Sequence, residues 1–147
     1  ELAAARSLGI ATEIVPGVTA ACAAAASLGR ALTCRGATDT LVLTTARHQT
    51  DGAVADVSRV VKRGTELAIY MGVSAAPDLA AQLLKNGLST VTRVEVVSEA
   101  STQRQTQLRT TLGAMARDIE AAGINGCALI LISNPNALET PILRKVS

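Results

Sequence analysis

The sequence predicts an α/β protein with a largely parallel or mixed sheet and flanking helices, and three observations support this fold class. Short runs of β-branched and other apolar residues, typical of strands, alternate with alanine-rich or amphipathic segments, typical of helices. Glycine or Asn-Gly follows most of the helical segments. Apolar residues make up 48% of the chain, which has one Tyr and neither Phe nor Trp, so the core must be packed from Ala, Val, Leu and Ile.

The first 35 residues are predicted to close an N-terminal α/β domain. Helical spacing in residues 1–8, a β-branched run in IATEIV (10–15) and an alanine-rich run over 18–28 indicate a helix, a strand and a second helix. Residues 31–39 lack periodicity and contain turn residues, so we place a domain boundary near Arg35. The chain opens without Met and inside a helical pattern, which leads us to expect a fragment that lacks an N-terminal portion.

Residues 36–147 are predicted to form a C-terminal α/β domain. Strands are expected where apolar and β-branched residues gather, and helices where apolar residues recur at helical spacing. TQRQTQLRTTL (102–112) fits either a strand or a loop. The predicted strands are residues 40–46, 66–71, 92–101 and 127–133, and the predicted helices are residues 53–62, 74–84 with Ser74 as N-cap, and 113–123.

Composition and charge argue against several functional classes. The formal net charge is +2 and the charges are scattered, so we expect no nucleic-acid groove. Cys22, Cys34 and Cys127 match neither a zinc site nor a redox pair, and their odd number argues against a disulfide framework, so a reducing cytoplasm is expected. No apolar run approaches the roughly 20 residues needed to cross a bilayer, so we expect no membrane association.

Four strand ends are candidates for holding a small molecule, because ligands of α/β proteins collect where strands end. The last of them, ISNPN (132–136), is explained better by a simple exit turn, and the other three are as follows. Thr19 and Ala20 in IVPGVTAA begin a helix, whose free N–H groups suit a carboxylate or hydroxyl, although a plain helix start explains them equally well. In IYMG, Gly72 would let a ligand approach the backbone beside Met71, although core filling is the default role of a Met. In SEAS, Ala100 opens a small-residue gap, as any turn would.

The other polar candidates are weaker. His48 could act as a general base, but no matching nucleophile or carboxylate pair accompanies it, and a surface loop explains it better. Arg35 and Arg47 suit the carboxylates of an acidic substrate or plain solvation. Gly-rich phosphate motifs and metal-ligand spacings are absent, so no metal is expected. These patterns alone support only a soluble α/β protein, with ligand binding as a hypothesis.

Four segments, taken together, resemble a known family. IVPGVTAA, LTCRG, IYMG and SEAS, in this order and at these separations, resemble the tetrapyrrole methylases, most closely the uroporphyrinogen-III C-methyltransferases. That subfamily has patterns such as VVPGxTAA, PLTHRG, YMG and ENGT or ENAS. The resemblance covers nearly the whole chain, although no single motif is very specific.

The resemblance implies the C-terminal portion of a two-domain methylase fold, with S-adenosylmethionine between the domains as methyl donor to an acidic porphyrinogen. It assigns Thr19, Ala20, Met71 and Ala100 to the cofactor and Arg35 to the substrate's carboxylates. The implied reaction converts uroporphyrinogen III to precorrin-2, for siroheme or cobalamin biosynthesis, in a cytoplasmic homodimer. The catalytic residues are expected in the missing N-terminal portion, so we expect the fragment to be inactive alone.

The chain departs from the family pattern at four positions. Cys34 replaces a His, Glu99 an Asn, Thr106 an Arg and Ser133 a glycine. These departures leave two alternatives open. One is a methyltransferase acting on a later precorrin, and the other is a non-catalytic dimerisation or binding module.

Overall fold

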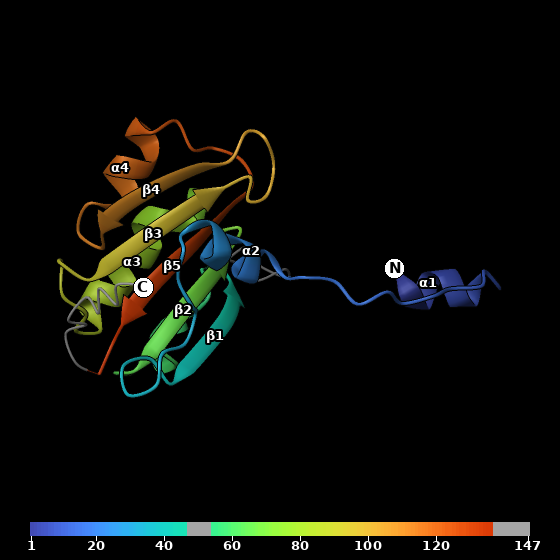
Figure 1. Ribbon diagram of the computed structural model, residues 1–147, viewed down its shortest axis with the longest axis horizontal. Helices are drawn as coiled ribbons and strands as arrows, with labels where there is room; N and C mark the ends of the chain where they lie inside the picture. Colours follow the sequence, from blue (N-terminus) through green and yellow to red (C-terminus); the bar gives the residue numbers. More distant parts are fainter. Residues whose placement is uncertain (47–53, 137–147) are drawn as a thin grey trace, which may run out of the picture.

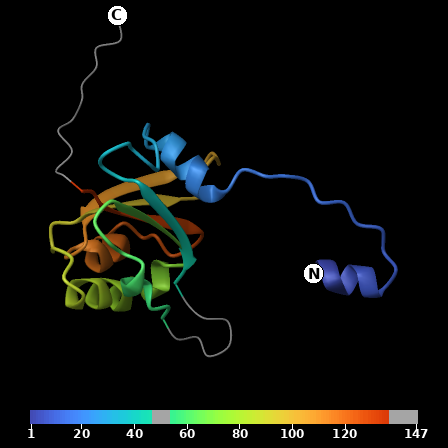
Figure 2. The same cartoon turned by 90° about the horizontal axis from the view of Figure 1, so that it is seen from below.

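The computed structural model describes residues 1–46 and 54–136 of the 147-residue chain. Within them, an open five-stranded sheet has helix α2 (Ala20–Ser27) on one face and helices α3 (Ala76–Lys85) and α4 (Met115–Ala121) on the other (Figures 1 and 2). The sheet is mixed and helices flank it, so the predicted α/β class is confirmed. The predicted boundary near Arg35 falls in the loop between α2 and the first strand and stays a prediction.

The strands lie in the order β1-β2-β5-β3-β4. β1 pairs with β2 in parallel, and every other neighbouring pair is antiparallel. The three inner strands are buried on both sides because helices cover both faces of the sheet. The strand bounds are β1 Thr40–Thr45, β2 Thr65–Tyr70, β3 Arg93–Ser98, β4 Thr106–Thr111 and β5 Ala128–Asn134.

Two hydrophobic clusters fill the spaces above and below the sheet. The larger one joins α3 and α4 to the sheet through side chains such as Leu79, Leu83 and Met115. The smaller one lies under α2, where Ala21, Ala24 and Leu28 pack on the small and aliphatic residues of the opposite face. The short alanine side chains let α2 lie close to the strands.

Most elements fall close to their predicted positions, and the structure settles two details: the start of α3 and the conformation of residues 102–112. A 3-10 turn, η2 (Val73–Ala75), precedes α3, whose N-cap is Ala75, so the prediction of Ser74 as N-cap is wrong. The ambiguous segment 102–112 begins as a loop and continues as β4.

Two predicted elements are not formed. Residues 10–15 are an exposed irregular segment rather than a strand, because no described residue lies beside them to complete a ladder. This segment lies between α2 and α1 (Leu2–Ser7), and α1 stands away from the sheet (Figures 1 and 2). In the described part of 53–62 there is only a 3-10 turn, η1 (Val57–Arg59). There the backbone N–H of Val57 donates to the side chain of Gln82 in α3. In addition, valines favour a helix only weakly.

No helix among the described residues is long and apolar enough to cross a membrane. Within the same residues, no group of three or more His, Cys, Asp or Glu could hold a metal ion.

Candidate functional site

A pocket of about 810 Å³ lies where β2 and β3 end and β5 begins. Ligand pockets of proteins have volumes of about 300–1,000 Å³, so this one can hold a molecule the size of a nucleoside carrying an amino acid. Its wall is mostly apolar, with a few polar side chains at the rim. The lining includes Ala20 of α2, Tyr70, Met71 and Val73 after β2, Val97, Glu99 and Ala100 after β3, and Asn125, Cys127 and Leu129 leading into β5.

Strained backbone gathers at this pocket. Among the described residues, the non-glycine residues with positive φ are Met71 (53°), Glu99 (48°) and Ser101 (66°). Met71 and Glu99 line the pocket, and Ser101 follows the pocket residue Ala100. A left-handed conformation costs an ordinary residue about 1–2 kcal/mol. Such strain clusters at binding sites, where the surroundings must hold it in place. Here the Glu99 N–H donates to the Cys127 carbonyl at 2.9 Å, which ties the β3 end to the start of β5.

Tyr70 joins the start of α2 to the end of β2. Its hydroxyl is hydrogen-bonded to Thr19 Oγ1 and accepts the backbone N–H of Ala21 at 3.1 Å. Thr19 is the N-cap of α2 in extended conformation, and its side chain makes no capping bond of its own. The Tyr70 hydroxyl therefore accepts one of the N-terminal N–H groups of α2 that were expected to bind a ligand.

Four of the five predicted site residues are brought together. Ala20, Met71 and Ala100 line the pocket, and Thr19 lies beside it, bonded to the pocket residue Tyr70. Arg35 is separate: it is exposed in the loop after α2, at the edge of the sheet where β1 and β2 begin, opposite the pocket. Arg47 and His48 lie outside the described residues.

Gly72 has a packing role that differs from the predicted one. A Cβ on this residue would lie 2.9 Å from Cδ1 of Ile130 and 3.2 Å from Cγ2 of Ile69. The missing side chain therefore makes room for the core of the sheet, and a ligand's approach to the Gly72 backbone stays a prediction.

Sequence reasoning missed the polar rim of the pocket. Arg104 donates from Nε to Glu99 Oε2 at 2.7 Å, and this hydrogen bond, with the carboxylate's charge, raises the pKa of Arg104. The loop between them is fastened by the Ser101 N–H, which donates to Gln105 Oε1 at 2.8 Å. The available signal was the unbroken run of polar residues directly after SEAS, TQRQTQ (102–107), which is typical of a surface loop. Asn125 and Tyr70 were missed as site residues as well.

The sequence model of the tetrapyrrole (corrin/porphyrin) methylases matches residues 1–116. The chain belongs to this family. Among curated relatives, the uroporphyrinogen-III C-methyltransferase of Pseudomonas aeruginosa is 34% identical over 124 residues, which cover 84% of this chain and 50% of that protein. Siroheme synthase 1 of Klebsiella pneumoniae is 39% identical over 112 residues, covering 76% of this chain and 24% of that protein. The chain thus spans about half the length of the Pseudomonas tetrapyrrole methylase and about a quarter of the synthase.

Solved structures of the family have the same fold. A cobalt precorrin-4 methyltransferase of cobalamin biosynthesis superposes with a TM-score of 0.80 at 28% identity, covering 90% of this chain and 56% of the other. The uroporphyrin-III C-methyl transferase of Thermus thermophilus complexed with S-adenyl homocysteine gives 0.71 at 24% identity, covering 90% and 57%. The Thermus likeness shows the fold alone.

Proposed function

We propose that this chain forms one wall of the cofactor site in an S-adenosylmethionine-dependent C-methyltransferase that converts uroporphyrinogen III to precorrin-2. The observation that carries the proposal is the pocket of about 810 Å³ that gathers Ala20, Met71 and Ala100 at one edge of the sheet. The sequence motifs that resemble the family's cofactor-binding segments thus meet at a single pocket. The names of two relatives, a uroporphyrinogen-III C-methyltransferase and a siroheme synthase, support the same assignment.

The residues of the pocket fit a cofactor of this kind. Met71 is 70% exposed at the pocket and can cover an apolar or sulfur-bearing group. Val97 and Leu129 provide a dry wall, while Glu99 and Asn125 offer polar atoms for hydroxyl, amino or ring nitrogen groups. S-adenosylmethionine supplies an electrophilic methyl group on a sulfonium, which an electron-rich pyrrole carbon can take without a metal. The protein then contributes orientation and exclusion of water.

We place the catalytic residues and the opposite wall of the cleft outside this chain, in an N-terminal domain of which residues 1–35 are the end. The exposed apolar side chains of Ile14, Val15 and Val18, 71–83% accessible, support this division because a neighbouring domain would bury them. The isolated chain is accordingly inactive. The whole enzyme is a cytoplasmic homodimer that serves siroheme or cobalamin biosynthesis.

Arg35 is assigned to the substrate rather than to the cofactor. It is exposed and lies away from the pocket, so it can reach only a molecule larger than the cofactor. A porphyrinogen carries several carboxylates, which a guanidinium binds in bidentate fashion.

The test is turnover. The 147-residue chain, and the same chain preceded by its upstream coding sequence, are incubated with S-adenosylmethionine and uroporphyrinogen III, and methylated products are followed by mass spectrometry. Methylation by the longer chain alone is expected. Methylation by the isolated chain would refute the division of labour, and none by either chain would refute the substrate assignment.

A later precorrin is the second candidate substrate. It is favoured by the likeness to cobalt precorrin-4 methyltransferase, with a TM-score of 0.80, and by Glu99 at a position where the uroporphyrinogen enzymes usually have Asn. Methylation of a precorrin but not of uroporphyrinogen III in the same assay would select it.

A further inference from the structure

Helix α2 lacks the polar face that normally determines which side of a helix is buried. Its sequence is AACAAAAS, and the buried Ala21, Ala24 and Ala25 are chemically identical to the exposed Ala20 and Ala26. Turning or sliding the helix on the sheet would exchange alanine for alanine, with little change in buried apolar area. The alanines therefore hold α2 on the sheet without fixing its orientation, and Leu28, just past the helix, is the one large apolar side chain of residues 20–28 that is buried there.

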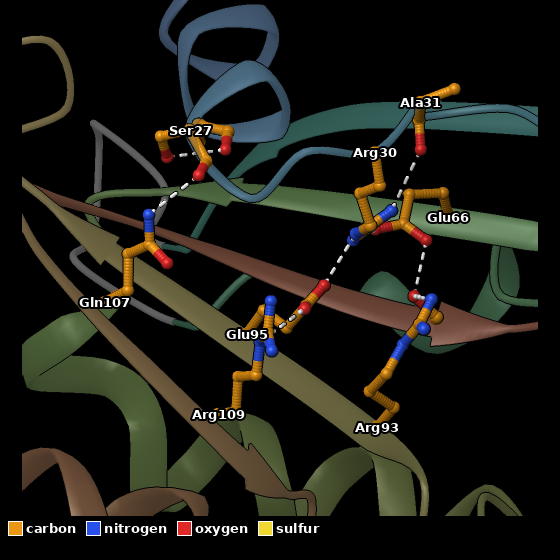
Figure 3. A network of polar contacts seen from close by, with 10 residues as sticks. Ser27, Arg30, Ala31, Glu66, Arg93, Glu95, Gln107 and Arg109 are labelled. Atoms are coloured by element: carbon orange, nitrogen blue, oxygen red, sulfur yellow. Dashed lines mark hydrogen bonds and ion pairs between the residues drawn. The ribbon is translucent and has the colours of Figure 1, made fainter. Parts of the chain in front are cut away.

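Polar contacts fix both ends of α2 instead. At the N-terminal end, the contacts are those of the Tyr70 hydroxyl with Thr19 and Ala21 described above. At the C-terminal end, Gln107 of β4 donates from Nε2 to the Ser27 carbonyl at 2.9 Å (Figure 3).

Arg30, just past the helix, makes the strongest of these contacts. Its Nη2 donates to Glu66 Oε1 at 2.5 Å and its Nε donates to Glu95 Oε2 at 2.6 Å (Figure 3). Glu66 is on β2 and Glu95 is on β3, and β5 runs between these two strands. The guanidinium thus reaches across β5 and is fixed in two directions at once, which a single ion pair could not achieve.

Both carboxylates are almost completely buried, with 1% and 4% of Glu66 and Glu95 exposed, and each has further partners. Ser133 donates from Oγ to Glu66 Oε2 at 2.6 Å, and Arg109 Nε lies 3.4 Å from Glu95 Oε1. Ser133 is one of the four departures from the family pattern, and this hydrogen bond gives it a structural role. Burial alone would lower the pKa of Arg30, but the hydrogen bonds and charges of the two glutamates outweigh it and raise that pKa.

A network of this kind is better suited to fixing geometry than to stabilising the fold. The desolvation cost of buried ions cancels much of their attraction, so replacing a whole buried network by neutral groups is often harmless to stability. Removing one partner is costly because it leaves an uncompensated buried charge. The arrangement therefore adds little net stability, but it defines one orientation of the residues that it joins.

We propose that Arg30 is a positioning residue for the pocket: its fork on Glu66 and Glu95 sets the orientation of α2, and thereby brings Thr19 and Ala20 against Tyr70. That the positioned ligand is S-adenosylmethionine rests on the proposed function. Arg30 itself touches neither the pocket nor its contents.

The chain contains its own reporter for this proposal. Tyr70 is the sole aromatic residue of the 147, so the near-ultraviolet circular dichroism of tyrosine reports the N-terminal end of α2 directly. This signal is independent of any cofactor. Disturbing Arg30, at the other end of the helix, should change it.

The decisive variant removes the three charges of the fork: Arg30→Met, Glu66→Gln and Glu95→Gln together. We expect its urea midpoint to be close to that of the unmodified chain and above that of Arg30→Met alone. Its tyrosine band should nevertheless change, and S-adenosylhomocysteine should bind about tenfold more weakly or worse, measured in the chain with its upstream sequence. Arg30→Lys, which keeps the charge but not the fork, should show the same two effects. Arg63→Met, at an exposed arginine just before β2, is the control and should show neither.

A triple variant with the native tyrosine band and a Kd within about twofold of the unmodified chain would overturn the proposal, since a purely stabilising network predicts that result. If the triple variant does not fold, Arg30→Lys decides by the same two readouts. If the unmodified chain with its upstream sequence fails to bind S-adenosylhomocysteine, the proposed function fails, and the tyrosine band alone decides whether Arg30 orients α2.

Discussion

Gly72→Ala is expected to destabilise the chain through one methyl group of Ile130. The new Cβ would lie 2.9 Å from Ile130 Cδ1, against an ordinary contact distance of 3.4–4 Å, and Ile130 has no exposed surface into which it could move. Overpacking of this kind costs about 1–3 kcal/mol. The backbone of Gly72 has φ −91° and ψ −12°, which alanine adopts without strain, so about 0.4–1 kcal/mol returns from the unfolded state. The net loss should be about 1–2 kcal/mol.

A double-mutant cycle isolates the cause. Ile130→Val deletes Cδ1, the atom that the new Cβ would strike, and by itself costs about 0.5–1.5 kcal/mol. In the pair Gly72→Ala and Ile130→Val the 2.9 Å clash is absent and the 3.2 Å contact with Ile69 Cγ2 remains, so the combined loss should fall short of the sum by about 1 kcal/mol. Urea denaturation followed by far-ultraviolet circular dichroism measures all four states. Gly17→Ala, where a Cβ would meet nothing within 4 Å, is the control and should be near neutral. Additive losses in the cycle would refute the reasoning.

Three further outcomes are expected. Ala100→Leu should fill part of the pocket and weaken S-adenosylhomocysteine binding at least about tenfold with little change in urea midpoint, measured by calorimetry and denaturation; unchanged affinity would place the ligand elsewhere. Arg35→Ala should leave that affinity unchanged and weaken uroporphyrinogen binding, measured by calorimetric titration under anaerobic conditions. A hydrogen bond from the Thr110 hydroxyl, and to a smaller extent the interaction with Arg117, lower the pKa of Asp118 from its usual 3.8. The ionised Asp118 therefore stabilises the fold above pH 3.8, and this stabilisation is lost as the pH falls through the lower pKa of the folded state. Thr110→Val should therefore flatten the fall of stability in this acid range, and an unchanged pH profile of urea midpoints would count against the hydrogen bond.

The strands of the sheet could be predicted because their signal is local. The apolar run over 127–133 became β5, at Ala128–Asn134, and 66–71 became β2, at Thr65–Tyr70. Residues 10–15 have the same β-branched character but stay irregular, since a strand also needs a neighbour, which composition does not reveal. The valines of 53–62 misled in the opposite way, since helical spacing did not produce a helix.

The candidate site, like the fold, could be predicted only where its signal is local. Met71 and Ala100 could be selected because they follow strands and match family motifs, and both line the pocket. The contacts that orient α2 could not be foreseen, because Arg30 lies 36 residues from Glu66 and 65 from Glu95. Only the pairing of β2 and β3 with β5 brings these carboxylates together, and register is a property of the folded sheet.

The central claim, that the pocket at the ends of β2 and β3 is half of a cofactor site, is tested most directly by calorimetric titration with S-adenosylhomocysteine. The titration compares the 147-residue chain, the chain with its upstream coding sequence, and the longer chain carrying Ala100→Leu. The account predicts binding by the longer chain, no binding by the isolated chain and marked weakening by the substitution. Absence of binding by the longer chain would contradict the account and favour a non-catalytic module.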